Sequence, residues 1–195
     1  EQQIICGHIY SDLCIRNVGV LVCLFTGIRV GEVCALTWED ISISEKTLYI
    51  HRTMQRIQTD DTERARTKII ITTPKSKYSV RRIPLPEELV RILEALKGSS
   101  SGYFLSGSEK KWVEPRTMQN HFKRLLKQCG VSDANFHALR HTFATRCVEL
   151  GFDVKSLSEI LGHASVNITM DRYVHPSMQL KQENMQRLSA LITVK

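Results

Sequence analysis

The spacing of hydrophobic residues changes twice along the chain, and this change constrains the fold more than any other feature. Residues 11–25, SDLCIRNVGVLVCLF, are apolar around much of a helical circumference, which predicts a buried helix capped by the serine at its start. After a break at TGIR, helical spacing resumes in VGEVCALTWEDI. Residues 47–57, TLYIHRTMQRI, then alternate between apolar and polar side chains and are rich in β-branched and aromatic residues, which indicates a strand.

Two more strand-like segments follow, KIIITTP and SVRRIPLP, so a small antiparallel sheet of three strands is expected from about residue 47 to 85. The polar stretch QTDDTERART between the first two strands is expected to be a loop or an extended hairpin. From Pro86 onward the pattern is again helical, in PEELVRILEALKG, PRTMQNHFKRLLKQCG, SDANFHALRHTFATRCVELG, DVKSLSEILGH and PSMQLKQENMQRLSALI. The sequence therefore predicts one α+β domain over residues 1–195, mainly helical with a small antiparallel three-stranded sheet.

The composition indicates which kinds of partner and which cellular compartment suit this chain. The chain carries 27 Lys and Arg against 20 Asp and Glu, a net charge of +7, which favours a polyanionic partner, although many basic proteins have none. The six cysteines are scattered, mostly in apolar runs, which is typical of a reducing, intracellular compartment and not of a disulfide framework. The longest apolar run, residues 18–25, is too short to span a membrane, and the first residues do not resemble a signal peptide.

The segment NFHALRHTFATRC, residues 135–147, places His137, Arg140 and His141 within five positions of an expected helix. The two histidines share one helix face, as the zinc ligands of H-E-x-x-H do. Here, however, Ala138 stands where that pattern has its general-base glutamate, and the guanidinium of Arg140 would repel a divalent cation. The segment therefore argues against a metal site.

An anion suits His137 and Arg140 better, because the planar guanidinium of arginine matches the geometry of phosphate oxygens. Taken alone, however, such a pair is more often a surface feature or a structural hydrogen-bond pair.

Three other segments have both a structural and a functional interpretation. TGIRVGE contains Arg29 and Glu32, which could simply form an ion pair. TTPKSKYSVRRIPL contains Lys75 in a basic hairpin, which could be a solvated β-turn. LGHASVNITMDRYVHP places His163 ten residues before Tyr173. In structural terms this segment could be a helix C-cap followed by an amphipathic helix whose tyrosine lies in the core.

Together and in this order, the segments resemble the signature of the tyrosine recombinases, also called the phage integrase family. That signature has an Arg in T-G-x-R-x-x-E, a Lys in a sheet hairpin, an H-x-x-R box, an L-G-H and a nucleophilic Tyr. The chain has TGIRVGE, PKSKYSVRRIPL, HALRHTFAT and LGHASVNITMDRYVH, and the resemblance covers about residues 17 to 176. The hairpin looks most like those of integrases from conjugative transposons and temperate phages. The resemblance implies the tyrosine recombinase catalytic-domain fold, and nothing in this chain corresponds to the core-binding domain that usually precedes it.

The resemblance also implies an enzyme that cleaves and rejoins DNA strands through a 3′-phosphotyrosine intermediate, without a metal, ATP or any other cofactor. Arg29 and Arg140 would bind the non-bridging phosphate oxygens and stabilise the charge of the transition state. Tyr173 would be the nucleophile, because a covalent link conserves the bond energy needed for rejoining. His137 or His163 would take the phenol proton or hydrogen-bond the phosphate. No L-G-H precedes the other tyrosines at the right distance: Tyr10, Tyr49, Tyr78 and Tyr103.

The remaining site residues have supporting roles in this prediction. Lys75 would be the general acid that protonates the leaving 5′-oxygen, with Lys77 as the less favoured neighbour. Glu32 would hold an arginine or histidine in place, and His141 matches no catalytic position of the family and is expected to be structural. Contacts to the DNA backbone, with solvated surface charges as the alternative, are assigned to Lys77, Arg81, Arg82, Arg116, Lys123 and Arg124.

The expected partners are double-stranded DNA, at attachment or transposon-end sites, and further copies of the chain in a homotetramer on that DNA. The C-terminal segment, residues 176–192, has apolar positions near helical spacing and is expected either to pack onto a neighbouring subunit or to fold back on its own core. The expected location is intracellular, in a bacterial cytoplasm or nucleoid. Two other functions remain open: a type IB topoisomerase, which nicks and reseals one duplex, and a basic DNA-binding module without catalytic activity.

Overall fold

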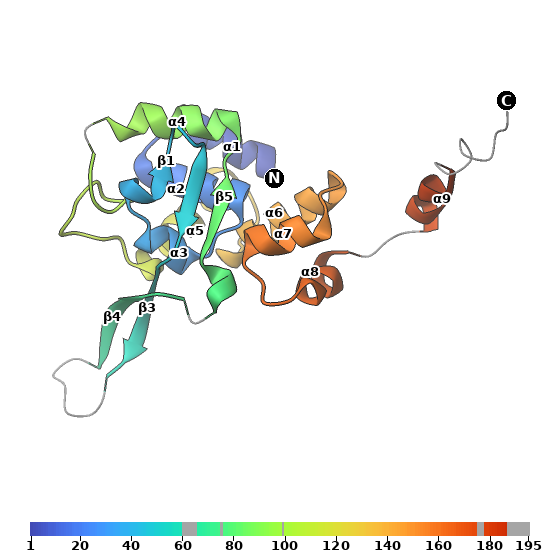
Figure 1. Ribbon diagram of the computed structural model, residues 1–195. Coiled ribbons are helices and arrows are strands. Elements are labelled where there is room, and N and C mark those ends of the chain that lie inside the picture. Colours follow the sequence, from blue (N-terminus) through green and yellow to red (C-terminus); the bar gives the residue numbers. More distant parts are fainter. Residues whose placement is uncertain (60–65, 75, 99, 175–177, 187–195) are drawn as a thin grey trace.

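The computed structural model describes residues 1–59, 66–74, 76–98, 100–174 and 178–186. Its helices are α1 (Gln2–Ser11), α2 (Ile15–Thr26), α3 (Val30–Ala35), α4 (Glu87–Lys97), α5 (Pro115–Gln128), α6 (His137–Glu149), α7 (Val154–Leu161), α8 (Val166–Tyr173) and α9 (Met178–Gln186). Its strands are β1 (Ile41–Ser42), β2 (Thr47–Ile50), β3 (Thr53–Gln58), β4 (Thr67–Thr72) and β5 (Arg81–Pro84), with short 3-10 helices η1 (Trp38–Asp40) and η2 (Lys77–Ser79). The predicted α+β class, mainly helical with a small antiparallel sheet, is confirmed (Figure 1).

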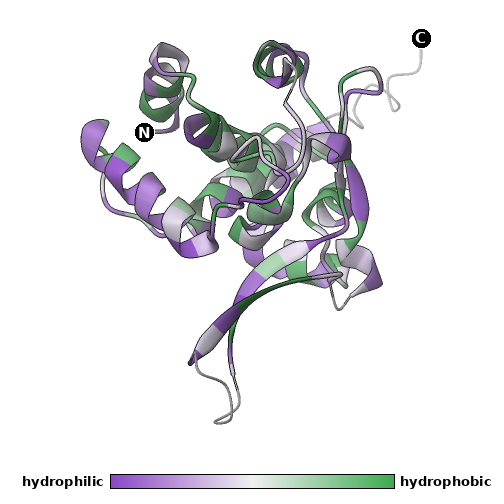
Figure 2. Cartoon of the chain, turned by 90° about the vertical axis from the view of Figure 1, so that its left-hand side faces the viewer, coloured by the Kyte–Doolittle hydropathy of each residue, from purple (hydrophilic) through white to green (hydrophobic). Residues whose placement is uncertain are grey.

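Helix α2 forms the centre of the core. All its residues from 17 to 24 are buried, and α1, α3, α4, α5 and α6 pack around it. A helix that is apolar over most of its circumference is stable in water only when other elements cover it on all sides. Figure 2 shows the result, with hydrophobic residues gathered inside the helical body. No helix of the described residues is long and apolar enough to cross a lipid bilayer.

The predicted start of this central helix at Ser11 is wrong. Ser11 is the last residue of a separate helix, α1, and α2 begins only after Cys14. The side chain of Asn17 holds the break, because it donates to the backbone carbonyl of Asp12 at 2.8 Å and to its carboxylate at 3.1 Å. The sequence did carry a signal for α1, since Ile5 and Ile9 are spaced four residues apart and are both buried.

Two antiparallel sheets stand where one was predicted. β2 pairs with β1 and β5 in a three-stranded sheet of order β1-β2-β5, whereas β3 and β4 form a separate hairpin that projects from the body (Figures 1 and 2). The predicted strand 47–57 is interrupted because His51 and Arg52 both turn toward Asp40, each with a nitrogen 2.8 Å from one of its carboxylate oxygens. The predicted loop between β3 and β4 lies mostly outside the described residues.

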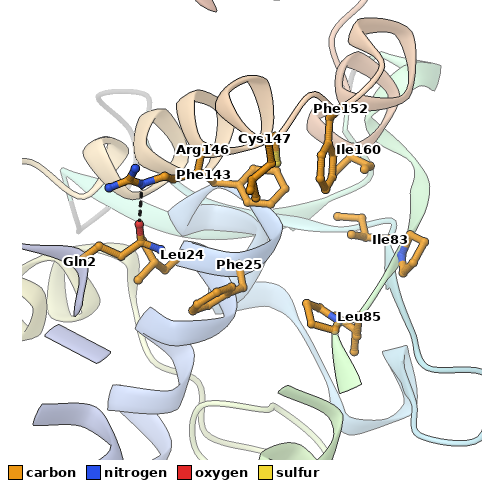
Figure 3. Close-up of a pocket in the computed structure, with 13 residues that line it drawn as sticks. Gln2, Leu24, Phe25, Ile83, Leu85, Phe143, Arg146, Cys147, Phe152 and Ile160 are labelled. Atoms are coloured by element: carbon orange, nitrogen blue, oxygen red, sulfur yellow. Dashed lines mark hydrogen bonds between the residues drawn. The ribbon is translucent and has the colours of Figure 1, made fainter. Parts of the chain in front are cut away.

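An apolar groove lies on one side of the body, bounded by α2, β5, α6 and α7 (Figure 3). Its volume is about 510 Å³, and the side chains that line it include Leu24, Phe25, Ile83, Leu85, Phe143 and Leu150. Leu150 at its rim is 75% exposed. A contiguous exposed apolar surface of this kind is typical of an interaction site. Helix α9 lies away from the body in Figure 1, with Met178 71% and Met185 64% exposed, and the rest of the predicted C-terminal helix is outside the described residues.

Candidate functional site

The ends of α2 and α7 meet the second turn of α6, and Arg140 joins them. Its guanidinium donates to the carbonyl of Gly27 at 2.8 Å and to the carbonyl of Leu161 at 2.7 Å, the groups that close α2 and α7. Both acceptors lie at the negative ends of helix dipoles, which favours a buried cation there. Position 27 requires a glycine for two reasons. Its φ of +66° is left-handed, and an added Cβ would lie 2.5 Å from the ring of Phe143.

Arg29 is the N-cap residue of α3, and Glu32 binds it in two ways. The amide of Arg29 donates to one carboxylate oxygen at 2.9 Å, and its guanidinium donates to the other at 2.9 Å. The ion pair suggested by the sequence is therefore confirmed. The side chain of Arg29 nevertheless remains 40% exposed, so it can still contact a ligand.

Arg81 was predicted to contact the DNA backbone, and this prediction is wrong. Its side chain is only 6% exposed. The guanidinium donates to both carboxylate oxygens of Glu32, at 3.2 and 3.0 Å, and to the carbonyls of Ser79 and Ile160. The alternation of β5 carries the signal for this, because Arg81 has the same parity as the buried Ile83, whereas Arg82 points outward.

Glu32 thus lies buried between two arginines. Burial raises the pKa of its carboxyl, but attraction and hydrogen bonds from Arg81, followed by attraction to Arg29, bring the pKa below its usual value. The carboxylate is therefore ionised at neutral pH. It fixes the position of both guanidinium groups, and its supporting role in the site stays a prediction.

A cleft of about 310 Å³ brings three predicted site residues together. Arg29, His137 and Arg140 line it, together with Ile28, Val30, Gln119, Asn135 and Phe136. Burial, then repulsion from Arg29, lowers the pKa of Arg140 to about 9, so this guanidinium stays charged at neutral pH. Burial, His141 and Arg140 lower the pKa of His137, so its imidazole is mostly neutral at pH 7 and able to accept a proton.

His163 belongs to the same neighbourhood. It follows Gly162, whose left-handed backbone ends α7, and its Nδ1 lies 2.8 Å from the hydroxyl of Thr169 in α8. Burial lowers the pKa of His163 to about 4, with further contributions from the charges of Arg140, Arg29, Arg172 and Arg81. The structure therefore brings His163 and both predicted phosphate-binding arginines close enough to influence one another.

Tyr173 ends helix α8, and it lies close enough to Arg140 to act on its charge. Its ring packs against the small apolar cluster of α6 and α7 and lies 5.6 Å from the ring of His141. The core-tyrosine interpretation accounts for this packing but not for the hydroxyl, which is buried and has no hydrogen-bond partner in the part of the chain that the structure describes. An unpaired buried hydroxyl costs about 1–3 kcal/mol, so its retention at this position calls for a functional explanation.

The other predicted residues are spread more widely. Lys75, the predicted general acid, lies outside the described residues. His141 contacts the rings of His137 and Tyr173, and its structural role stays a prediction. The predicted DNA contacts other than Arg81 are all exposed: Lys77, Arg82, Arg116, Lys123 and Arg124. Two of them are paired on the surface, Arg82 with Glu45 and Lys123 with Asp133.

Two residues near the site were missed by the sequence analysis. Arg172 precedes Tyr173 and acts electrostatically on His137, His141 and His163. Thr169 contacts His163. A charged residue beside the predicted nucleophile was a usable signal, whereas nothing in the sequence pointed to the threonine. Among the described residues, no group of three or more His, Cys, Asp or Glu side chains could hold a metal ion.

Known proteins with a similar sequence cover most of this chain. A protein of Caldanaerobacter subterraneus subsp. tengcongensis named "Tyrosine recombinase XerC-like" is 31% identical over 188 residues, covering 88% of this chain and 48% of that protein. The ICEBs1 integrase of Bacillus subtilis is 27% identical, covering 88% of this chain and 48% of the integrase. The chain thus spans about half the length of these curated relatives.

Solved structures show the same fold. The Tn1549 transposon integrase in complex with transposon right end DNA superposes with a TM-score of 0.76 at 23% identity, covering 97% of this chain and 64% of the integrase. The predicted tyrosine recombinase catalytic-domain fold and the predicted likeness to conjugative transposon integrases are confirmed. The model of the phage integrase family matches residues 6–180, and the chain therefore belongs to that family.

Proposed function

We propose that this chain is the catalytic domain of a site-specific recombinase, the integrase of a transposon, phage or other mobile genetic element, which cleaves and rejoins DNA strands through a 3′-phosphotyrosine. The observation that carries the proposal is the convergence of Arg29, Arg140 and His163, with Tyr173 close enough to act electrostatically on Arg140. The hydroxyl of Tyr173 is buried and has no hydrogen-bond partner among the described residues. Membership of the phage integrase family supports it.

The residue types match the chemistry of phosphodiester cleavage. The oxygen of Tyr173 attacks phosphorus, a new P–O bond forms, and the bond to the 5′-oxygen breaks. Negative charge grows on the non-bridging oxygens during this step, and Arg29 and Arg140 are fixed cationic donors that stabilise it without reorganising. A neutral histidine of the site can take the phenol proton, and Lys75, carried over from the family hairpin, would protonate the leaving 5′-oxygen.

A covalent-trapping experiment tests the proposal. The full chain is incubated with a labelled pool of nicked suicide duplexes of randomised sequence, in which cleavage releases a short fragment and prevents rejoining. We expect a denaturant-stable protein–DNA adduct from the wild type and from the control Tyr78→Phe, and none from Tyr173→Phe. The adduct should also form in EDTA, because the arginines supply the charge stabilisation.

An adduct from Tyr173→Phe, or none from the wild type, would contradict the proposal. Joining of strands from two separate duplexes distinguishes a recombinase from a type IB topoisomerase, which reseals only the strand that it has cut.

Double-stranded DNA is the partner that this function requires. The net charge of +7 and the exposed cations Lys77, Arg82, Arg116, Lys123 and Arg124 support binding to phosphates, and affinity should then fall steeply with added salt. The solved complex of the Tn1549 integrase with transposon right end DNA supports the same partner class. A DNA substrate also implies an intracellular site of action, with a bacterial cytoplasm or nucleoid expected.

We further propose that the chain assembles as a homotetramer on DNA, with the C-terminal segment of one subunit seated in the apolar groove of the next. The groove carries exposed Phe25, Leu150 and Phe152 at its rim, and the methionines of α9 are exposed as well. Burying both surfaces against each other removes apolar area from water. The sequence has further leucine or isoleucine residues at positions 188, 191 and 192.

Sedimentation of protein–DNA complexes tests the assembly. We expect tetramers from the wild type and from Leu13→Asp, whose side chain is exposed outside the groove. Leu150→Asp, which places a charge at the rim of the groove, and a chain that ends at residue 177 should both remain monomeric on DNA. Tetramers of the shortened chain would contradict the proposed exchange.

A further inference from the structure

A half-buried histidine, His163, contacts a buried threonine, Thr169. Thr169 is fully buried in α8, and its hydroxyl lies 2.8 Å from Nδ1 of His163. The left-handed backbone at Gly162 turns the chain out of α7 directly before the histidine, so that its ring reaches α8. An imidazole has two distinct nitrogens, and a partner on one of them decides what the other can do.

The direction of this hydrogen bond follows from the buried hydroxyl. A threonine in a helix commonly donates to the carbonyl four residues earlier, as Thr26 does to Val22 at 2.6 Å. Within the described residues Thr169 has no such bond, and Nδ1 of His163 is the hydrogen-bond partner of its hydroxyl. Because buried hydroxyl groups rarely leave their proton unpaired, Thr169 donates and Nδ1 accepts.

The protonation state of the ring completes the argument. Burial and the charges of Arg140, Arg29, Arg172 and Arg81 lower the pKa of His163 to about 4, so the ring carries a single proton at neutral pH. Since Nδ1 accepts a hydrogen bond, that proton is on Nε2.

We propose that Thr169 is a positioning residue that fixes His163 as the Nε2–H tautomer and so makes it a hydrogen-bond donor to the scissile phosphate. The proposal rests on the proposed function. It also separates the two histidines, because an N–H cannot accept the phenol proton, and this leaves His137 as the proton acceptor of the site.

Two substitutions separate the hydroxyl from the shape of the side chain. Thr169→Val keeps the shape but leaves Nδ1 without its donor, whereas Thr169→Ser keeps the hydroxyl. Thr26→Val is the matched control, because it removes another fully buried threonine hydroxyl, one that binds only the backbone. Urea unfolding of each full-length variant shows that it is folded before it is compared.

The first measurement is the tautomer of His163, read from the nitrogen chemical shifts of the resting protein by NMR at pH 7. We expect Nε2–H in the wild type, Thr169→Ser and Thr26→Val, and loss of this single form in Thr169→Val. The second measurement is the single-turnover rate of adduct formation on the nicked duplex pool. Loss of a group that orients a metal-bound histidine typically costs about 10- to 100-fold, and we expect a loss of similar size for Thr169→Val. The rate of Thr169→Ser should stay within about threefold of the wild type, because its histidine keeps its partner.

A wild-type ring protonated on Nδ1 would overturn the proposal. So would a Thr169→Val variant with an unchanged tautomer and rate, or a Thr169→Ser variant as slow as Thr169→Val. If the wild type forms no adduct at all, the proposed function fails, but the tautomer measurement still decides whether Thr169 sets the proton on His163.

Discussion

Arg81 and Arg82 are neighbours in β5 that differ in how far water can screen their charge. The side chain of Arg81 is 6% exposed and its ion pair with Glu32 is buried, whereas that of Arg82 is 61% exposed and pairs with an equally exposed Glu45. Glu32 in turn holds Arg29, so the buried pair also supports a residue of the proposed site.

Removing each arginine should therefore have very different effects on stability. Arg81→Met leaves the carboxylate of Glu32 buried with one partner fewer, and breaking a buried ion pair in this way costs about 3–5 kcal/mol. Arg82→Met removes only an exposed pair, which is worth about 0–1 kcal/mol. Urea unfolding of the two variants measures the difference, and equal losses would contradict the assignment of Arg81 to the interior.

The residues that the sequence identified share one property. Each belongs to a short segment in which residue type and spacing alone point to a chemical role. They are Arg29, Glu32, His137, Arg140 and the pair His163 and Tyr173. Arg81 and Thr169 matter through contacts that depend on the fold, such as the bond from Arg81 to the carbonyl of Ile160, 79 residues away. The hydrophobic pattern of one segment cannot predict a contact with a distant segment. The alternation within β5 does predict that Arg81 points inward, but not which group it binds.

At the scale of elements, the site is made from helix ends. Arg29 caps α3, Gly27 closes α2, and Leu161 and Gly162 close α7. Arg140 lies within α6, but its guanidinium binds the carbonyls at the ends of α2 and α7. Helices α4 and α5 were well predicted because proline and glycine mark their ends, whereas α6 begins at His137, five residues after the start of the predicted segment. The strands were predicted less well, since the break between β2 and β3 depends on Asp40, which binds His51 and Arg52 from outside the strand.

The importance of close packing at Gly27 can be tested by comparison with Gly151, a glycine with a similar backbone conformation and no packed neighbours. Gly27 and Gly151 both have left-handed backbones, with φ of +66° and +76°. An added Cβ at Gly27 would lie 2.5 Å from Phe143 and 2.8 Å from Leu161, whereas nothing lies within 4 Å of one at Gly151. Gly151→Ala should cost about 1–2 kcal/mol, the usual penalty for a left-handed non-glycine residue.

Gly27→Ala should cost about 3 kcal/mol or more, because overpacking adds to the backbone strain. It should also slow adduct formation, since the carbonyl of Gly27 holds Arg140. Thermal unfolding and the trapping assay measure the two effects. A Gly27→Ala variant as stable and as active as Gly151→Ala would show that the close packing at this turn does not position Arg140.

At the scale of the whole molecule, the site concentrates positive charge. Four guanidinium groups lower the pKa of His163 through their charge: those of Arg29, Arg81, Arg140 and Arg172. In the described part of the chain, the carboxylate of Glu32 forms ion pairs with Arg29 and Arg81. Burial, followed by repulsion from neighbouring positive charges, lowers the pKa values of His137, His141 and His163 below the usual value for histidine. A bound phosphate would relieve the same repulsion, so the fold carries an electrostatic cost that the proposed binding of DNA would reduce.

This cost predicts how stability depends on pH. The unfolded chain protonates His163 near pH 6.5, whereas burial and Arg140, Arg29, Arg172 and Arg81 lower the pKa of His163 to about 4 in the folded protein. Between these two values the unfolded state binds more protons, so the free energy of unfolding should fall as the pH is lowered from about 6.5 to about 4. Urea unfolding across this range, repeated with His163→Asn, measures the contribution. The variant should lose less stability than the wild type, because its side chain no longer titrates. Equal slopes in both proteins would contradict a lowered pKa of His163 in the folded protein.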